Sequence, residues 1–217
     1  CHDPHGNSSF RLLYQDGQNT TSATGTVIAW NTSVDATGIG YFGPGTVETN
    51  TSHNAYRAGY SEWCSECHGD FHAASANLIH PSGEDLEDRQ IAVYNAYNGT
   101  TDCVNNPPAG AVPCGTGTYA GAYLAMVPFE DTNNVLTSQV TGVTSGTSKV
   151  ACMSCHRAHA SSAPDAGRWD FNVTGLAEDG QESGSFALPN PYDGNQRSLC
   201  NKCHAQDEYD ALVDFTP

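Results

Sequence analysis

Apolar residues in this chain fall in short runs and not in long periodic stretches. Residues 17–50 contain two brief apolar pieces, Val27 to Trp30 and Ile39 to Phe42, separated by Gly, Asn, Asp and Thr. Short runs bounded by turn-forming residues predict brief strands joined by turns. Tyr119 to Phe129 predicts a further strand, and the segment 136–148, rich in Thr, Ser and Gly, predicts a loop.

One segment has the spacing of an amphipathic helix. Ser82 followed by Asp85 is typical of a helix start, and Gly99 is typical of a helix end. Apolar residues lie between them at helical intervals: Leu86, Ile91, Tyr94 and Tyr97. A short acidic helix is also expected at Gln206 to Phe215. Regular structure is therefore predicted to be a minority of the chain, with loops making up the rest.

The composition is lean for a chain of this length. Of 217 residues, 38% are hydrophobic and 9% aromatic, so we expect partial disorder unless a large apolar group supplies the interior. The length suits one domain or two small ones, and we predict a single domain over residues 1–217.

Acidic residues outnumber basic ones by 24 to 8, and the formal net charge is −16. No basic cluster occurs, which argues against nucleic acid and anionic membrane surfaces as partners. No apolar run approaches the length that spans a membrane, so membrane insertion is not expected. No signal peptide is recognised, so we expect a mature or shortened chain.

Six of the nine cysteines form three Cys-x-x-Cys pairs, and a histidine directly follows each pair. The three motifs are Cys64, Cys67 and His68; Cys152, Cys155 and His156; and Cys200, Cys203 and His204. Cysteines three positions apart are separated by about one helical turn, so both thiols project to one side. Each thiol can bond to a vinyl group of one porphyrin while the adjacent histidine binds the iron. The motifs therefore predict c-type haem.

Two other interpretations of the pairs explain less. Zinc also binds Cys-x-x-Cys pairs, but zinc has no need of a histidine directly after every second cysteine. A thioredoxin-like redox pair would lie next to a βαβ pattern, and no such pattern surrounds any of the motifs.

The first five residues repeat the second half of this motif. Cys1 and His2 are followed by His5, just as Cys155 and His156 are followed by His159. One account is that the motif begins before Cys1, so that Cys1 and His2 belong to a fourth haem. A haem held by a single thioether bond is a second account, and a lipidated N-terminal cysteine is a third.

The two remaining cysteines, Cys103 and Cys114, flank a loop rich in Pro and Gly. A disulfide that closes this loop is the natural interpretation, and it would imply an oxidising compartment. Two unrelated thiols are the alternative.

Histidines are sufficient to give every iron two axial ligands. Four of the nine are proximal, and five remain as distal candidates: His5, His53, His72, His80 and His159. An iron with two histidines has no open position for a substrate, so electron transfer is predicted rather than catalysis. Any one of the five can instead be an ordinary surface residue, an interpretation that is strongest for His53 in its polar surroundings.

The spacing of the distal candidates predicts closely packed haems. His5 and His159 follow a proximal histidine by three residues, and His72 follows His68 by four. So short a segment cannot reach the far side of the same haem, and each histidine must therefore serve another haem. His80 lies far enough along to return as a distal ligand from a loop.

With these motifs the chain resembles the extracellular cytochrome filaments of metal-respiring bacteria and some archaea, and the tetrahaem branch most closely. The resemblance rests on the Cys-His-x-x-His units, on Cys64 to His68 leading to Phe71, His72, His80 and Pro81, and on the closing Leu199 to His204. It implies a multihaem cytochrome c fold, mostly irregular loops with few short helices and strands around a stacked chain of four bis-histidine haems. It also implies an extracellular or cell-surface homopolymer that passes electrons to external acceptors. In such a head-to-tail polymer, His5 would bind the iron held by His204 of the next subunit.

The position of His204 near the end of the sequence supports a ligand supplied by the next subunit. Only 13 residues follow His204 and none is histidine, so supply of its distal ligand by another chain is plausible, and an open head-to-tail contact gives a filament. A discrete periplasmic or surface electron carrier is the alternative, and a multihaem reductase is a further one that would need an exchangeable iron ligand.

Six Asn-x-Ser/Thr sequons are the last feature: Asn7, Asn19, Asn31, Asn50, Asn98 and Asn172. Several are expected by chance in a chain rich in Asn and Thr, but they would suit a glycosylated surface protein.

Overall fold

The computed structural model describes about two thirds of the chain, in two compact units that are treated separately here. The described residues are 1–31, 35–41, 48–72, 82–97, 117–159, 161, 163–171, 182–183, 186–187 and 199–204. Unit 1 comprises Cys1–Asp85, Pro128–Gln139 and Thr147–Ser154, and unit 2 comprises Leu86–Val127, Val140–Gly146 and Cys155–Pro217. The single domain expected over residues 1–217 stays a prediction.

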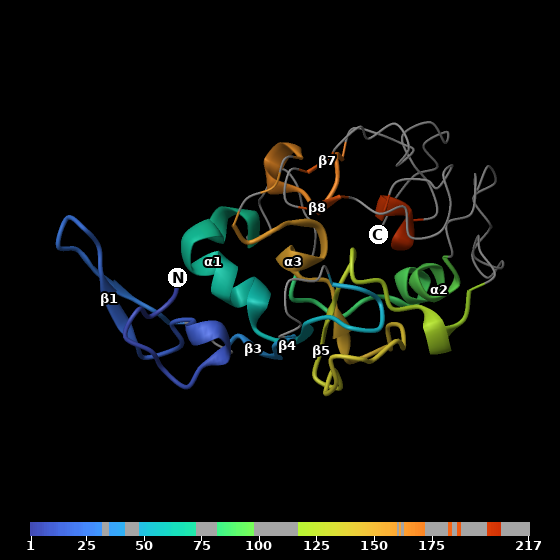
Figure 1. Ribbon diagram of the computed structural model, residues 1–217, viewed down its shortest axis with the longest axis horizontal. Coiled ribbons are helices and arrows are strands. Elements are labelled where there is room, and N and C mark those ends of the chain that lie inside the picture. The colour runs from blue at the N-terminus through green and yellow to red at the C-terminus, as the bar shows by residue number, and fades with distance from the viewer. Residues whose placement is uncertain are drawn as a thin grey trace. The chain divides into compact units, whose positions relative to one another are not determined.

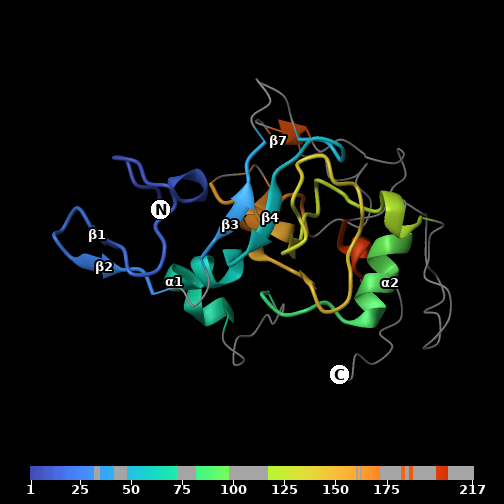
Figure 2. The ribbon, with the colours of Figure 1, turned by 90° about the horizontal axis from the view of Figure 1, so that it is seen from below.

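Unit 1 contains short strands and one longer helix. The 3-10 turn η1 (Phe10–Leu12) precedes an antiparallel hairpin of β1 (Asn19–Thr21) and β2 (Val27–Ala29), which extends away from α1 (Tyr60–His72) (Figure 1). β3 (Thr37–Ile39) pairs antiparallel with β4 (Ala55–Ala58), and the two lie side by side just before α1 (Figure 2). β5 (Glu130–Asp131) pairs with β6 (Ser148–Lys149).

Unit 2 is built around the helix α2 (Asp88–Ala96) and several 3-10 turns. These turns are η2 (Tyr119–Gly121), η3 (Pro164–Ala166) and η4 (Leu199–Lys202), and β7 (Glu182–Ser183) pairs with β8 (Phe186–Ala187). The four-residue helix α3 (Cys152–Cys155) lies where the chain passes from one unit to the other. None of the described helices has both the length and the apolar content of a membrane span.

The predicted strands near the N-terminus are confirmed with shifted ends. Val27–Ala29 is β2, as expected, but the strand expected at Ile39 to Phe42 runs from Thr37 to Ile39. Its pairing with β4 explains the shift, because Ile39 opposes Ala55 and Gly38 opposes Tyr56. The largely irregular path over 136–148 is also confirmed, since only Ser148 of that segment joins a strand.

The predicted helix begins later than the sequence suggests. Ser82 and Asp85 lie outside α2, whose N-cap is Glu87. Tertiary pairing holds this segment out of the helix, because the Gly83 N–H donates to the Val150 carbonyl at 2.8 Å and Asp85 forms a β-bridge with Lys149. Gly99 and the acidic helix expected at 206–215 lie outside the described residues.

The strand predicted at Tyr119 to Phe129 is wrong. The segment opens with the turn η2, closed by a 3.0 Å hydrogen bond from the Gly121 N–H to the Thr118 carbonyl. A second turn follows, in which the Val127 N–H donates to the Leu124 carbonyl at 2.9 Å. Side chains from Ala122 to Ala125 are all buried, so this run fills an interior as a folded loop and does not alternate across a sheet.

The apolar core of unit 1 gathers the segments that carry three of the motifs. Phe10 and Tyr56 both pack edge-on against Tyr60, with ring centroids 5.9 and 5.0 Å away. Trp63, directly before Cys64, and Met153, directly after Cys152, pack against the same cluster. The cluster itself consists of Leu13, Ala36, Tyr56, Tyr60 and Ala151. A small core therefore brings residues 1–5, 64–68 and 152–154 into one unit.

The buried carboxyl group of Glu130 caps the helix α1. Its Oε1 accepts hydrogen bonds from the backbone N–H groups of Tyr60 and Ser61 at 2.9 and 3.2 Å, which satisfies donors that a helix start leaves without intrahelical partners. Burial, and then the nearby charge of Glu62, raises the pKa of Glu130 to about 7. The start of the motif-bearing helix is thus tied to β5.

We expect replacement of Glu130 by glutamine to flatten the pH dependence of stability. The pKa of Glu130 is raised in the folded state, so its contribution is present at low pH and is lost as the pH rises from about 4.5 through 7. Glutamine can still accept both N–H bonds but does not ionise, so the wild type should lose up to about 3 kcal/mol relative to Glu130→Gln over this range. Chemical denaturation at several pH values measures the difference. A pH profile of Glu130→Gln that runs parallel to that of the wild type would contradict the assignment.

Candidate haem-binding sites

The three complete motifs lie on short helical elements that hold their cysteines one turn apart. Cys64 and Cys67 lie in α1, and Cys152 and Cys155 are the ends of α3. Cys200 lies in η4, where the N–H groups of Cys203 and His204 donate to its carbonyl at 3.1 and 2.9 Å. Each element therefore presents two thiols as the sequence predicts.

The motif cysteines and the histidines that follow them are exposed or half-buried. Cys1 and Cys67 are exposed, and the other five described cysteines are half-buried. His2, His68 and His156 are exposed and His204 is half-buried. Since bonding to haem needs accessible thiols and an accessible imidazole next to them, these residues fit covalently attached haem.

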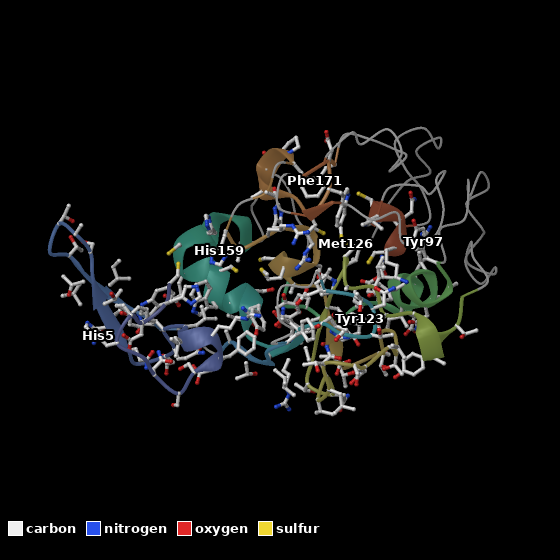
Figure 3. All side chains as sticks on the ribbon, viewed as in Figure 1. His5, Tyr97, Tyr123, Met126, His159 and Phe171 are labelled. Carbon is white, nitrogen blue, oxygen red and sulfur yellow. The ribbon has the colours of Figure 1, made fainter. Side chains whose placement is uncertain are left out.

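Two proximal histidines have the tautomer that iron binding through Nε2 requires. The Nδ1 atoms of His2 and His156 lie 2.8 and 2.9 Å from the carbonyl oxygens of Arg11 and Asp165. A carbonyl oxygen only accepts, so each Nδ1 carries the proton and Nε2 is left with its lone pair for a metal. Phe171, labelled in Figure 3, packs edge-on against the His156 ring with centroids 5.5 Å apart.

These two histidines belong to a repeated backbone structure that extends well beyond the Cys-His-x-x-His unit. In both copies the carbonyl lies nine residues after the histidine, at the centre of a 3-10 turn, η1 or η3. His2 bridges to Leu13 and His156 bridges to Gly167 in the same way. The side chains at these later positions differ between the copies, which explains why the sequence reveals only the first five residues of the repeat.

Cys64 and Cys152, which belong to two different motifs, lie close together within unit 1. A hydrogen bond with the Cys152 thiol, and then burial, raises the pKa of the Cys64 thiol. Cys152 also lies 3.8 Å from the hydroxyl of Ser82. The first cysteines of two different motifs are thus in contact, and haems attached to them would be neighbours.

Lys202, between the two cysteines of the last motif, packs into unit 2. Its side chain is fully buried, with Nζ 4.3 Å from the ring centroid of Tyr94 and 3.4 Å from the Tyr97 carbonyl oxygen. Burial lowers its pKa to about 7. Sequence reasoning did not identify this residue, since an isolated lysine usually indicates a solvated surface. The contact fixes η4, and with it Cys200 and Cys203, to α2.

The predicted distal histidines are only partly described. His5 and His159 are exposed (Figure 3), and the His5 N–H donates to Asp3 Oδ1 at 2.9 Å. His72 ends α1, but its side chain is not among those described, and His80 lies outside the described residues. Cys103 and Cys114, the predicted disulfide, also lie outside them.

His53 is buried, so the surface interpretation is wrong for this residue. Its exposure is 1%, and Nδ1 and Nε2 lie 2.9 and 2.8 Å from the carbonyl oxygens of Asn54 and Gln139. Its backbone N–H also donates to the Thr137 carbonyl at 2.9 Å. Pairing with a segment more than 80 residues later in the chain removes this polar stretch from solvent.

Comparison with known proteins supports the haem interpretation. No family model matches the chain. The c-type cytochrome OmcS of Geobacter sulfurreducens is 34% identical over 203 residues, which cover 75% of this chain and 43% of OmcS. The chain is thus similar to a c-type cytochrome over part of that protein's length. It spans less than half the length of this curated relative.

Two solved structures have the same fold. The outer membrane cytochrome S filament from Geobacter sulfurreducens matches with a TM-score of 0.60 and 29% identity, covering 92% of this chain and 55% of that chain. A second structure, of OmcS nanowires from the same organism, matches with a TM-score of 0.54 and 24% identity over 95% of this chain and 65% of that chain. The expected loop-rich cytochrome fold and the extracellular or cell-surface location are confirmed by these relatives.

We expect replacement of His53 by leucine to lower stability but to leave haem content unchanged. The change removes a buried imidazole that lies within hydrogen-bonding distance of the Asn54 and Gln139 carbonyls, and loss of one such hydrogen bond costs about 1–3 kcal/mol. Chemical denaturation gives the stability, and the haemochrome spectrum gives haem per chain. Loss of one haem, or of one low-spin signal, would instead identify His53 as an iron ligand.

Proposed function

We propose that this chain transfers electrons through four closely spaced c-type haems, each with two axial histidines, as part of an extracellular filament. The observation that carries the proposal is the contact between Cys64 and Cys152, because haems bonded to touching cysteines lie within reach for electron transfer. Similarity to OmcS and its filaments supports the polymer. The haems would carry the electrons, and the chain would hold, orient and insulate them.

The histidine count supports two axial ligands for every iron. Both ring nitrogens of His53 engage backbone carbonyls, so we assign it a structural role. Eight histidines then remain for four haems: His2, His68, His156 and His204 as proximal ligands, and His5, His72, His80 and His159 as distal ligands. With no open iron position, the function is electron transfer and not reduction of a bound substrate.

We further propose that His5 binds the iron held by His204 of the adjacent subunit. His5 is exposed, as a ligand for another chain must be. Such a contact joins two different surfaces and does not close on itself, so it propagates into a filament. Iron–imidazole bonds would also offset the repulsion between subunits of charge −16.

The oxidised protein should show only low-spin ferric haem. Two imidazole ligands produce low-spin iron, whereas a reductase site with an exchangeable ligand would be high-spin. Electron paramagnetic resonance and the visible spectrum distinguish the two, and added carbon monoxide should leave the reduced spectrum unchanged. A high-spin signal that responds to carbon monoxide would favour the reductase.

Replacement of His5 by alanine should abolish long filaments and leave haem per chain unchanged. The covalent attachments remain, but the subunit interface loses its iron ligand. Electron microscopy of purified material gives filament length, and His53→Leu is the matched control because it removes a histidine that we assign to the interior. Filaments of normal length in His5→Ala would contradict the proposal that His5 binds the iron of the adjacent subunit, and would indicate another interface ligand.

Cys103 and Cys114 should resist alkylation until the protein is reduced, if they form the proposed disulfide. Seven cysteines are assigned to haem, so these two are the remaining candidates. Peptide mass mapping with alkylation before and after reduction measures the pairing. Alkylation of both residues without reductant would show two separate thiols.

The sequons differ in accessibility where they are described. The side-chain amide of Asn7 donates to the carbonyls of Leu12 and Leu13, which leaves it poorly placed as an acceptor. Asn19 and Asn31 are exposed and are the acceptors we propose if the protein is glycosylated.

A further inference from the structure

The strained backbone of the described chain is confined to the two copies of the repeated structure. Four non-glycine residues have positive φ values: Arg11 at 50°, Leu12 at 58°, Asp165 at 56° and Ala166 at 54°. Left-handed backbone is unfavourable for residues with a side chain, and such strain tends to collect at functional sites. Two adjacent strained residues at the same place in both copies point to a shared task.

The left-handed pair turns a carbonyl group toward the proximal histidine in both copies. The carbonyl of the first residue of each pair accepts from Nδ1 of His2 or His156. The carbonyl of the second residue, Leu12 or Ala166, accepts the N–H of the residue after that histidine at 2.8 Å. The two carbonyl groups of the pair thus accept hydrogen bonds from the histidine ring and from the backbone N–H of the next residue.

The rest of the repeat holds the same geometry without using the same side chains. The N–H groups of Tyr14 and Arg168 donate to the carbonyls of Cys1 and Cys155 at 3.2 and 2.7 Å. Arginine and leucine in one copy correspond to aspartate and alanine in the other, so only the backbone conformation is shared.

We propose that the left-handed pairs Arg11–Leu12 and Asp165–Ala166 are positioning residues that set the reduction potential of the haems bound by His2 and His156. This rests on the proposed haem binding. A proximal histidine that donates from Nδ1 to a fixed carbonyl is a more basic ligand. A more basic ligand favours ferric over ferrous iron, and therefore lowers the potential of that haem. The two copies would give their haems similar proximal ligands.

Paired substitutions at Asp165 test the proposal. Asp165→Gly and Asp165→Val remove the same carboxylate, but glycine adopts the left-handed conformation freely whereas a β-branched residue does not. In a redox titration followed in the visible spectrum, Asp165→Gly should differ from the wild type only by the small shift that loss of a carboxylate gives. In Asp165→Val, with full haem content, one component should move to a more positive potential than it has in Asp165→Gly, while the others stay. Identical titrations of both variants would overturn the proposal.

The same pair of changes at Arg11 provides an independent test. Arg11→Val should move a different component from Asp165→Val, and Arg11→Gly should resemble the wild type. If the valine variants fail to load haem while the glycine variants load it fully, rescue by glycine supports positioning through the backbone. If the glycine variants also fail to load haem, the side chains themselves are needed, and the proposal of positioning through the backbone is overturned.

Haem content separates this proposal from the proposed function. Wild-type protein without covalently bound haem would contradict both. Full haem content with low-spin spectra, combined with valine variants that titrate as the wild type does, would contradict only the tuning role.

Discussion

The contact between Glu130 and the start of α1 is the interaction on which unit 1 depends. It fixes two backbone N–H groups at the first turn of the helix that carries Cys64, Cys67 and His68. The same turn supplies Tyr60, whose ring is packed edge-on by two other aromatic residues. One buried carboxyl group therefore sets both the position of a motif-bearing helix and the centre of the core. Burying that group costs free energy, which is why its pKa is raised.

A lean composition is workable in this fold because the motif-bearing segments themselves supply core residues. Trp63 and Met153 lie next to or between motif cysteines, and both pack against the apolar cluster of unit 1. Lys202 lies between the two cysteines of the last motif, and its buried side chain anchors that motif to α2 in unit 2. Residues inside or next to the motifs thus serve as packing anchors.

The proximal histidines are held in more than one way. His2 and His156 lie in the repeated structure, where a strained turn presents a carbonyl group to Nδ1. His68 instead lies at a kink inside α1, with φ −121° and ψ 35°, and His204 lies two residues after the end of a 3-10 turn. A non-glycine residue in the left-handed conformation costs about 1–2 kcal/mol. Its occurrence in both copies of the repeat therefore indicates that the histidine site requires this backbone conformation.

Local spacing alone determined the chemistry of the attachment sites. Cysteines three apart with a histidine next to the second are fixed relative to each other by one helical turn, whatever surrounds them, and the structure has them so in α1, α3 and η4. The short strands at Val27 and the loop over 136–148 were likewise predictable from turn-forming residues. Tertiary pairing decided the rest: the late start of α2 follows from the bridge between Asp85 and Lys149, and the burial of His53 follows from the distant Gln139 carbonyl. The carbonyl groups that orient His2 and His156 could not be predicted from the sequence, because every residue type carries a carbonyl and only the folded backbone decides where it points.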